Sequence, residues 1–207
     1  MKFNLIDREK WKRKEYFEHY YSQVPCTYSM TVKIDITKII KSGRKIYPAM
    51  LYYLTKTVNI NDEFRVSFNK TGKLGIFDEL IPCYTVFNKT TETFSNIWTE
   101  YKENYDDFYT EYKKDIEIFG SVNKMEAKSN VPDNVFFVSM IPWETFDGFN
   151  LNIQKDYNYL LPIFTMGKYY NIDEKYMLPL AIQVHHSVCD GFHVCRFVQN
   201  LKSFIEM

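Results

Sequence analysis

Residues 183–193 read Gln-Val-His-His-Ser-Val-Cys-Asp-Gly-Phe-His, and they join a predicted strand to a predicted helix. The nearly unbroken apolar run 177–184 predicts a buried β-strand before the turn. Apolar residues then recur at helical spacing, at Val194, Cys195, Val198, Leu201, Phe204 and Ile205. Asp190 stands where a helix N-cap belongs, and Gly191 follows it. The histidines therefore lie at the end of a strand, where open sheets usually carry their chemistry.

The two adjacent histidines have different expected roles. Histidine is the side chain best suited to proton transfer near neutral pH. Neighbouring strand residues point to opposite faces, so His185 and His186 cannot both face one cavity. A lone histidine is more often a hydrogen-bonded core residue, and we keep that interpretation for His185. We expect His186 to face the working side, and His193 to lie in the first turn of the helix.

The order of residues in this stretch is more specific than any single histidine. The sequence His-His-Ser-Val-Cys-Asp-Gly-Phe-His resembles the active-site signature of the chloramphenicol acetyltransferase family, and 179–197 is similar without a gap. The resemblance runs from Trp11 to the final helix. It implies transfer of acetyl from acetyl-CoA to the C3 hydroxyl of chloramphenicol, which inactivates the antibiotic, in a ternary complex. It also implies a homotrimer with active sites at subunit interfaces.

The resemblance assigns two catalytic residues. His186 would be the general base. Ser139 lies near the end of the apolar run 135–141, with Met140 and Ile141 between it and Pro142-Trp143, and would donate a hydrogen bond to the oxyanion. Taken alone, a serine at a strand end more often binds nearby backbone.

Asp190 has three possible roles on the residues alone. It could orient an imidazole, cap the helix, or pair with a cation. The resemblance implies a buried ion pair with an arginine in the first helix. Trp11, Lys12 and Arg13 match that motif, so Arg13 is the expected partner that holds the loop presenting His186.

Further site residues come from the resemblance. The expected substrate-binding residues are Tyr20, Val24, Cys26, Phe94, Leu151 and Thr165. Thr165 would bind substrate through its hydroxyl or a water, whereas Tyr20, Phe94 and Leu151 could equally be ordinary core residues. Lys168 and Tyr169 are candidates for contacts with coenzyme A, since the chain has no Gly-rich phosphate loop.

A metal site and a thiol nucleophile are two alternatives for the same stretch. His185, His186, Cys189 and His193 are all potential zinc ligands, but strand geometry separates the first two and the spacing matches no common zinc pattern. We therefore expect no metal. A thiolate beside an imidazole would be reactive, but the resemblance makes Cys189 a residue of the turn.

Composition limits the class of protein. The 207 residues carry 26 basic and 26 acidic side chains, and this zero net charge argues against nucleic-acid or membrane partners. A hydrophobic fraction of 45% suffices for a core. Residues 1–14 have no secretory apolar region, and no run is long enough for a membrane span. The four cysteines have no disulfide-scaffold spacing, which favours a reduced cytoplasmic protein. We expect one domain, 1–207.

Periodicity along the chain predicts the elements. Strands are expected at 28–36, 83–87, 135–141, 161–169 and 177–184, with a hairpin at 65–77. Helices are expected at 7–21, 48–58 and, as one long and possibly broken region, 93–119. This mixture predicts an α/β or α+β protein with helices on one face of a sheet. The resemblance implies a two-layer sandwich with a mixed sheet.

Two other functions share these features. The dihydrolipoyl acyltransferase core has the same fold and a related His-x-x-x-Asp-Gly signature, but it normally follows lipoyl and linker segments. A non-catalytic, drug-sequestering trimer would have no need of His186 and Ser139. Two departures from the family pattern stand out: Ser187 replaces the more usual alanine, and 116–132 matches poorly.

Overall fold

A large β-sheet runs through the molecule, a computed structural model that describes residues 2–151 and 158–207. Its strands are β2 (Thr27–Asp35), β5 (Ile81–Asn88), β6 (Thr93–Trp98), β7 (Val135–Met140), β8 (Ile163–Met166), β9 (Tyr170–Ile172) and β10 (Lys175–His185). Within the described residues the order is β2-β10-β8-β7-β5-β6, and β9 pairs with the start of β10. β7 runs parallel to β5 and β8, whereas the other neighbours are antiparallel. The predicted mixed sheet is confirmed.

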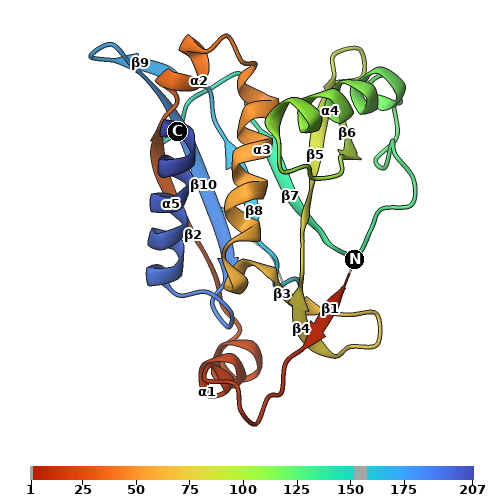
Figure 1. The fold of residues 1–207 in the computed structure, drawn as a ribbon, viewed down its shortest axis with the longest axis vertical. Helices are drawn as coiled ribbons and strands as arrows, with labels where there is room; N and C mark the ends of the chain where they lie inside the picture. The colour runs from red at the N-terminus through yellow and green to blue at the C-terminus, as the bar shows by residue number, and fades with distance from the viewer. Residues whose placement is uncertain (1, 152–157) are drawn as a thin grey trace.

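Helices cover one face of this sheet (Figure 1). They are α2 (Thr37–Lys41), α3 (Ile46–Asn59), α4 (Tyr105–Phe119) and α5 (Gly191–Glu206). The central helix α3 contacts both α4 and α5. A short helix, α1 (Lys14–Glu18), lies beyond one end of the sheet and continues into a π-helical turn, His19–Gln23. Among the described helices, none has both the length and the apolar character needed to cross a membrane.

Strand β10 is buried on both faces. Leu178, Leu180, Ile182 and Val184 are at most 2% exposed and belong to the main core. On the opposite face, the loop after β7 covers the strand. The backbone N–H of Leu151 donates to the side chain of Gln183 at 3.0 Å, and that of Phe149 donates to Thr31 on neighbouring β2 at 3.3 Å. Burial on both faces explains why the sequence of β10 reads as an almost continuous apolar run.

Helix α5 follows β10 after a five-residue turn. Asp190 has extended backbone angles (φ −100°, ψ 169°) and is the N-cap, as predicted. The buried residues of α5 recur at the spacing of one helix face: Val194, Phe197, Val198, Leu201 and Ile205. The predicted strand–turn–helix is therefore confirmed.

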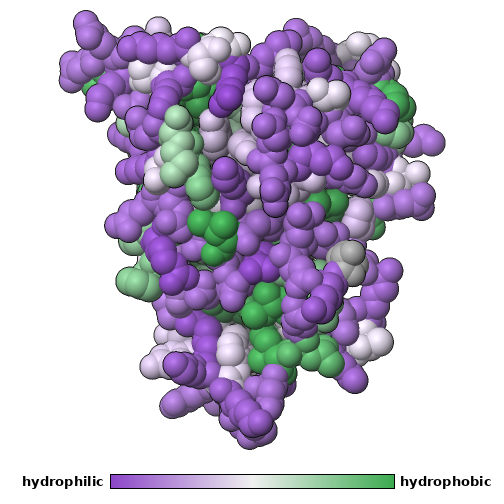
Figure 2. Space-filling model, viewed as in Figure 1, coloured by the Kyte–Doolittle hydropathy of each residue, from purple (hydrophilic) through white to green (hydrophobic). Residues whose placement is uncertain are grey.

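A smaller sheet lies next to the N-terminus, in the order β1 (Phe3–Leu5), β4 (Leu74–Phe77), β3 (Val66–Phe68). β3 and β4 form the hairpin predicted at 65–77. Gly72 in its turn has φ +74°, a conformation that favours glycine. Residues of both sheets belong to one hydrophobic core. The face seen in Figure 2 is mostly hydrophilic, with small hydrophobic patches between the polar side chains.

The prediction of one helical region at 93–119 is wrong in its first part. Thr93–Trp98 forms strand β6, which pairs with β5, because partners distant along the chain decided its conformation. The helix starts only at Tyr105, where the side chain of Asn104 accepts the backbone N–H of Asp106 at 2.8 Å. Within the region predicted as a helix at 7–21, regular helix starts only at Lys14. Strands β1 and β9 were not predicted.

Candidate active site

The side chain of His186 lies just beyond the end of β10. Its backbone N–H donates to the carbonyl oxygen of Cys26 at 2.9 Å, which extends the pairing with the β2 side by one residue. Its ring stacks on Tyr20, with centroids 3.9 Å apart and planes 9° apart. Tyr28 meets the same ring edge-on, at 5.2 Å. The side chain is still 28% exposed. The imidazole is therefore held in place and is also accessible to a ligand.

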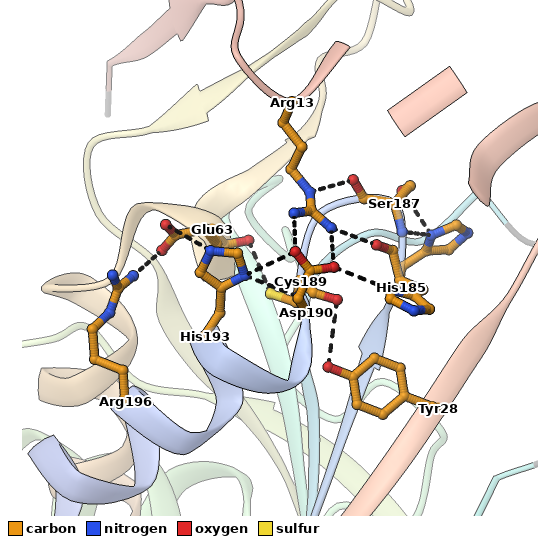
Figure 3. A network of polar contacts seen from close by, with 10 residues as sticks. Arg13, Tyr28, Glu63, His185, Ser187, Cys189, Asp190, His193 and Arg196 are labelled. Carbon is orange, nitrogen blue, oxygen red and sulfur yellow. Dashed lines mark hydrogen bonds and ion pairs between the residues drawn. The ribbon is translucent and has the colours of Figure 1, made fainter. Parts of the chain in front are cut away.

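Arg13 ties the turn after β10 together (Figure 3). Its guanidinium donates to both oxygens of Asp190, at 2.5 and 2.7 Å. It also donates to the backbone carbonyls of His186, at 2.8 Å, and Ser187, at 2.7 Å. One planar cation therefore holds both ends of the turn that presents His186.

The charges of this pair reinforce each other. The hydrogen bond from Arg13 lowers the pKa of Asp190, although burial opposes the shift. Burial would lower the pKa of Arg13, but the hydrogen bond and charge of Asp190 outweigh it and the pKa is raised. Both groups therefore stay ionised at neutral pH. The Nδ1 atom of His186 lies 3.3 Å from Asp190 Oδ1, but the angle does not make a hydrogen bond.

His185 points away from His186 and is 2% exposed. Its Nδ1 accepts the backbone N–H of Ser187 at 3.2 Å and lies 2.7 Å from the Ser187 hydroxyl. Burial, and then the neighbouring His186, lower the pKa of His185 to about 4. His185 is therefore a neutral, buried ring that shapes the turn.

Cys189 is not placed as a nucleophile. Its side chain is 1% exposed, and its thiol donates to the carbonyl oxygen of Glu63 at 3.5 Å. Burial raises the pKa of the thiol, so the thiolate is disfavoured. Among the residues described, no group of three or more His, Cys, Asp and Glu side chains is arranged to hold a metal ion.

Ser139 ends β7 beside Thr165 of β8. The two residues are register partners, and their hydroxyl oxygens are 3.1 Å apart. Ser139 also lines a cavity of about 740 Å³, together with Phe94, Trp143 and Phe149. A hydroxyl at the wall of this mostly apolar cavity can donate to a negative charge that develops there.

His186 and Ser139 lie far apart within one copy of the chain. Ser139 pairs with Thr165, and Thr165 pairs with Ala181 of β10. His186 is five residues farther along, which is roughly 16 Å along the strand and about 10 Å across two strand spacings. One copy therefore does not place this base and this hydroxyl around one small substrate.

The predicted site residues divide between these two places. Tyr20 and Cys26 contact His186, and the exposed Val24 lies between them in sequence. Phe94 and Thr165 gather with Ser139. The backbone of Leu151 binds the side chain of Gln183, which lies on β10 between the position that pairs with Thr165 and His186.

Lys168 and Tyr169 follow β8 on the Ser139 side. The Lys168 backbone N–H donates to Glu144 at 2.8 Å, and its side chain is exposed. The ring of Tyr169 is 40% exposed and meets Tyr176 edge-on at 6.0 Å. Both side chains are thus free to contact a ligand at the surface.

Three residues of the His186 environment were missed from the sequence. Tyr28 contacts the ring of His186, and its hydroxyl donates to the carbonyl oxygen of Cys189 at 3.4 Å. Its position at the start of the predicted strand 28–36 was a usable signal. Glu63 and Arg196 lie behind Asp190 in the same network (Figure 3), and nothing in the local sequence marks them.

A family model described as chloramphenicol acetyltransferase matches residues 1–202. The chain belongs to the chloramphenicol acetyltransferase family. The resemblance inferred from 183–193 is therefore confirmed, and so is the prediction of an acyltransferase.

Curated relatives share this similarity over nearly their whole length. The chain is 60% identical to a chloramphenicol acetyltransferase of Clostridium perfringens, over 99% of each chain. It is 59% identical to one of Clostridioides difficile, over 99% of this chain and 97% of that one. It is 47% identical to one of Staphylococcus aureus, over 99% and 100%.

Solved structures show the same fold. A chloramphenicol acetyltransferase superposes with a TM-score of 0.85 at 20% identity, covering 99% of this chain and 100% of that one. A dihydrolipoamide acetyltransferase from Azotobacter vinelandii gives 0.64 at 17% identity, covering 92% and 85%. At these identities the likeness shows the fold alone, and it supports the predicted two-layer architecture.

Proposed function

We propose that the protein transfers acetyl from acetyl-CoA to the C3 hydroxyl of chloramphenicol, and so confers resistance to this antibiotic. The observation that carries the proposal is the state of His186, a ring that is fixed by Tyr20 and the Arg13-bound turn but left exposed. Close relatives that bear the name chloramphenicol acetyltransferase match the chain from end to end.

The proposed reaction needs one base and one hydrogen-bond donor. Neutral His186 removes the proton of the C3 hydroxyl while that oxygen attacks the thioester carbonyl. Ser139 donates to the oxyanion of the tetrahedral intermediate. The intermediate collapses with cleavage of the carbon–sulfur bond, and His186 returns the proton to the departing thiolate of coenzyme A. Both substrates are bound together, so no covalent enzyme intermediate is needed.

We propose that each active site forms between two copies of the chain, in a homotrimer. The support is the distance between His186 and Ser139 within one copy, which is several times the size of the reacting groups. A rotated neighbour can bring its His186 to the Ser139 of the first copy, and three such contacts close a ring. Arg13 and Asp190 then support the site from the copy that supplies the base.

Ligand contacts are proposed for both sides of this interface. Chloramphenicol would lie against Tyr20, Val24 and Cys26 on the His186 side, and against Phe94, Leu151 and Thr165 on the other. The 740 Å³ cavity next to Ser139 would take the narrow pantetheine arm of acetyl-CoA, with Lys168 and Tyr169 at its outer end. An apolar cavity suits this arm because it carries few charges.

Three further expectations stay part of the proposal. Residues 1–207 would act as one catalytic domain, and the reaction would use no metal. The four cysteines are free thiols, which suits the reducing cytoplasm.

The test is thiol release from acetyl-CoA, with chloramphenicol or dihydrolipoamide as acceptor. We expect release that requires chloramphenicol, falls at least about 100-fold in His186→Ala, and falls about 100-fold in Ser139→Ala. Ser67→Ala, a strand serine in the smaller sheet, is the matched control and should keep full activity. Release with dihydrolipoamide alone would contradict the proposed acceptor, and tight drug binding without release would show a sequestering protein.

A further inference from the structure

A second group of side chains lies behind Asp190, away from Arg13. His193, in the first turn of α5, accepts the backbone N–H of Asp190 on its Nδ1 at 2.9 Å. The other ring nitrogen, Nε2, lies 3.5 Å from Glu63 Oε1. Glu63 comes from the 3₁₀ turn Asp62–Arg65 that follows α3. Figure 3 shows the chain of contacts from this turn through His193 to Asp190.

The protonation of this group follows from its contacts. Because Nδ1 accepts a hydrogen bond, the proton of the neutral His193 ring is on Nε2 and faces the Glu63 carboxylate. Burial lowers the pKa of His193, even though Glu63 opposes the shift. Burial acts to raise the pKa of Glu63, but a backbone hydrogen bond and Arg196 outweigh it, and the pKa is lowered. A neutral ring therefore turns its Nε2–H toward a carboxylate oxygen 3.5 Å away.

Glu63 is itself held in place from two directions. Arg196 of α5 donates to its Oε2 at 2.6 Å, and the same guanidinium donates to Asn61 at 3.2 Å. Asn61 is 2% exposed and is anchored to the backbone of Thr57 in α3. The backbone carbonyl of Glu63 accepts the thiol of Cys189. Glu63 is thus a fixed point outside the turn that carries His186.

We propose that Glu63 is a positioning residue for acetyl transfer: it fixes the ring of His193, which fixes the backbone of Asp190 and hence the turn that presents His186. Arg13 holds the carboxylate of Asp190 from one side, and Glu63 with His193 holds its backbone from the other. This inference rests on the proposed role of His186 as the base. A small displacement of the His186 ring is enough to slow acetyl transfer, because the rate depends on how closely the base is placed against the substrate hydroxyl.

The test is a double-mutant cycle on steady-state kinetics with chloramphenicol and acetyl-CoA. Glu63→Gln keeps the shape but removes the charge. His193→Gln keeps an acceptor for the helix cap but loses the imidazole contact with Glu63. We expect each variant to lower kcat about 10-fold with both KM values within about twofold. The double variant should be no slower than either single one, since both break the same link.

Glu100→Gln removes an exposed partner of Lys102 and should leave kcat unchanged. Losses that multiply in the double variant, or a Glu63→Gln enzyme equal to wild type, would overturn the proposal while His186→Ala still tests the base. Activity that survives His186→Ala would instead overturn the proposed function.

A measurement on the wild-type protein tests the proposal even if these variants do not fold. The ¹⁵N chemical shifts of the His193 ring report which nitrogen carries the proton. We expect protonated Nε2 and unprotonated Nδ1 at pH 7. The opposite tautomer would remove the bond to Asp190 and overturn the proposal.

Discussion

Arg13 and Asp190, 177 positions apart in the chain, form a two-point ion pair with N–O distances of 2.5 and 2.7 Å. The same guanidinium binds the backbone carbonyls of His186 and Ser187. The pair is therefore also a backbone clamp, and its loss would free four acceptors at once.

Arg13→Lys should lower both stability and activity, although it keeps the positive charge. A compact ammonium cannot reach four acceptors arranged around a planar fork. We expect a loss of about 2–4 kcal/mol in the free energy of unfolding and about a 10- to 100-fold fall in kcat. Chemical denaturation and initial rates would measure both. The matched control is Arg8→Lys, whose exposed pair with Glu18 at 3.8 Å should change stability by less than about 1 kcal/mol. Equal effects of the two changes would contradict the clamp.

The loss of stability caused by Asp190→Asn should depend on pH, and it should become smaller at acid pH. The folded-state pKa of Asp190 is lowered by Arg13, so its stabilising effect is complete above the unfolded pKa of about 3.9. That effect is lost as the pH falls through the lower, folded pKa. The difference in unfolding free energy between wild type and Asp190→Asn should be constant from about pH 5 to 7 and should shrink below about pH 4. Denaturation curves across this range would check it, and a constant difference down to pH 3 would contradict it.

His185→Gln should change how the free energy of unfolding depends on pH, in a window closer to neutral than that of Asp190. The pKa of His185 is lowered to about 4 in the folded protein, so the unfolded chain binds its proton first as the pH falls. The ring therefore stabilises the fold fully above the unfolded pKa of about 6.5, and this contribution, up to about 3 kcal/mol, is lost between pH 6.5 and 4. Unfolding free energies should rise with pH in this window for wild type and rise less for His185→Gln. An identical slope in both proteins would refute the assignment. The control is His19→Gln, a change on the exposed π-helical turn that should keep the wild-type slope.

Mixed oligomers should regain activity that their parents lack. If His186 of one copy works with Ser139 of the next, unfolding and refolding an equal mixture of His186→Ala and Ser139→Ala gives intact sites at about a quarter of the interfaces. Thiol release should therefore return to about a quarter of the wild-type rate. Mixing without unfolding is the control and should stay at the parents' rates. No recovery after refolding would show that both residues act from one copy.

The strand–turn–helix at 177–205 could be predicted because its signals are local: an apolar run, a cap and a helical repeat. The ion pair of Arg13 with Asp190 could be predicted only from the family resemblance, because nothing in the local sequence distinguishes one arginine in a charged segment. Strand β6 was mistaken for helix because its conformation depends on pairing with β5. Glu63 was missed for the same kind of reason, since it reaches His193 only after α3 and α5 pack together. The distance between His186 and Ser139 depends on strand order, which the sequence does not state.

The position of β10 also has a consequence for how the protein is made. This strand lies between β2 and β8 in the sheet, yet it follows both of them along the chain and so leaves the ribosome after them. A nascent chain that has not yet made β10 leaves the edge strand β2 separated from the rest of the sheet, and Arg13 cannot form its ion pair until Asp190, 177 positions later, has been made. The turn that presents His186 therefore cannot form before residue 190 has been made, and a chain that stops short of this residue is left with an exposed core rather than with a slightly weakened fold.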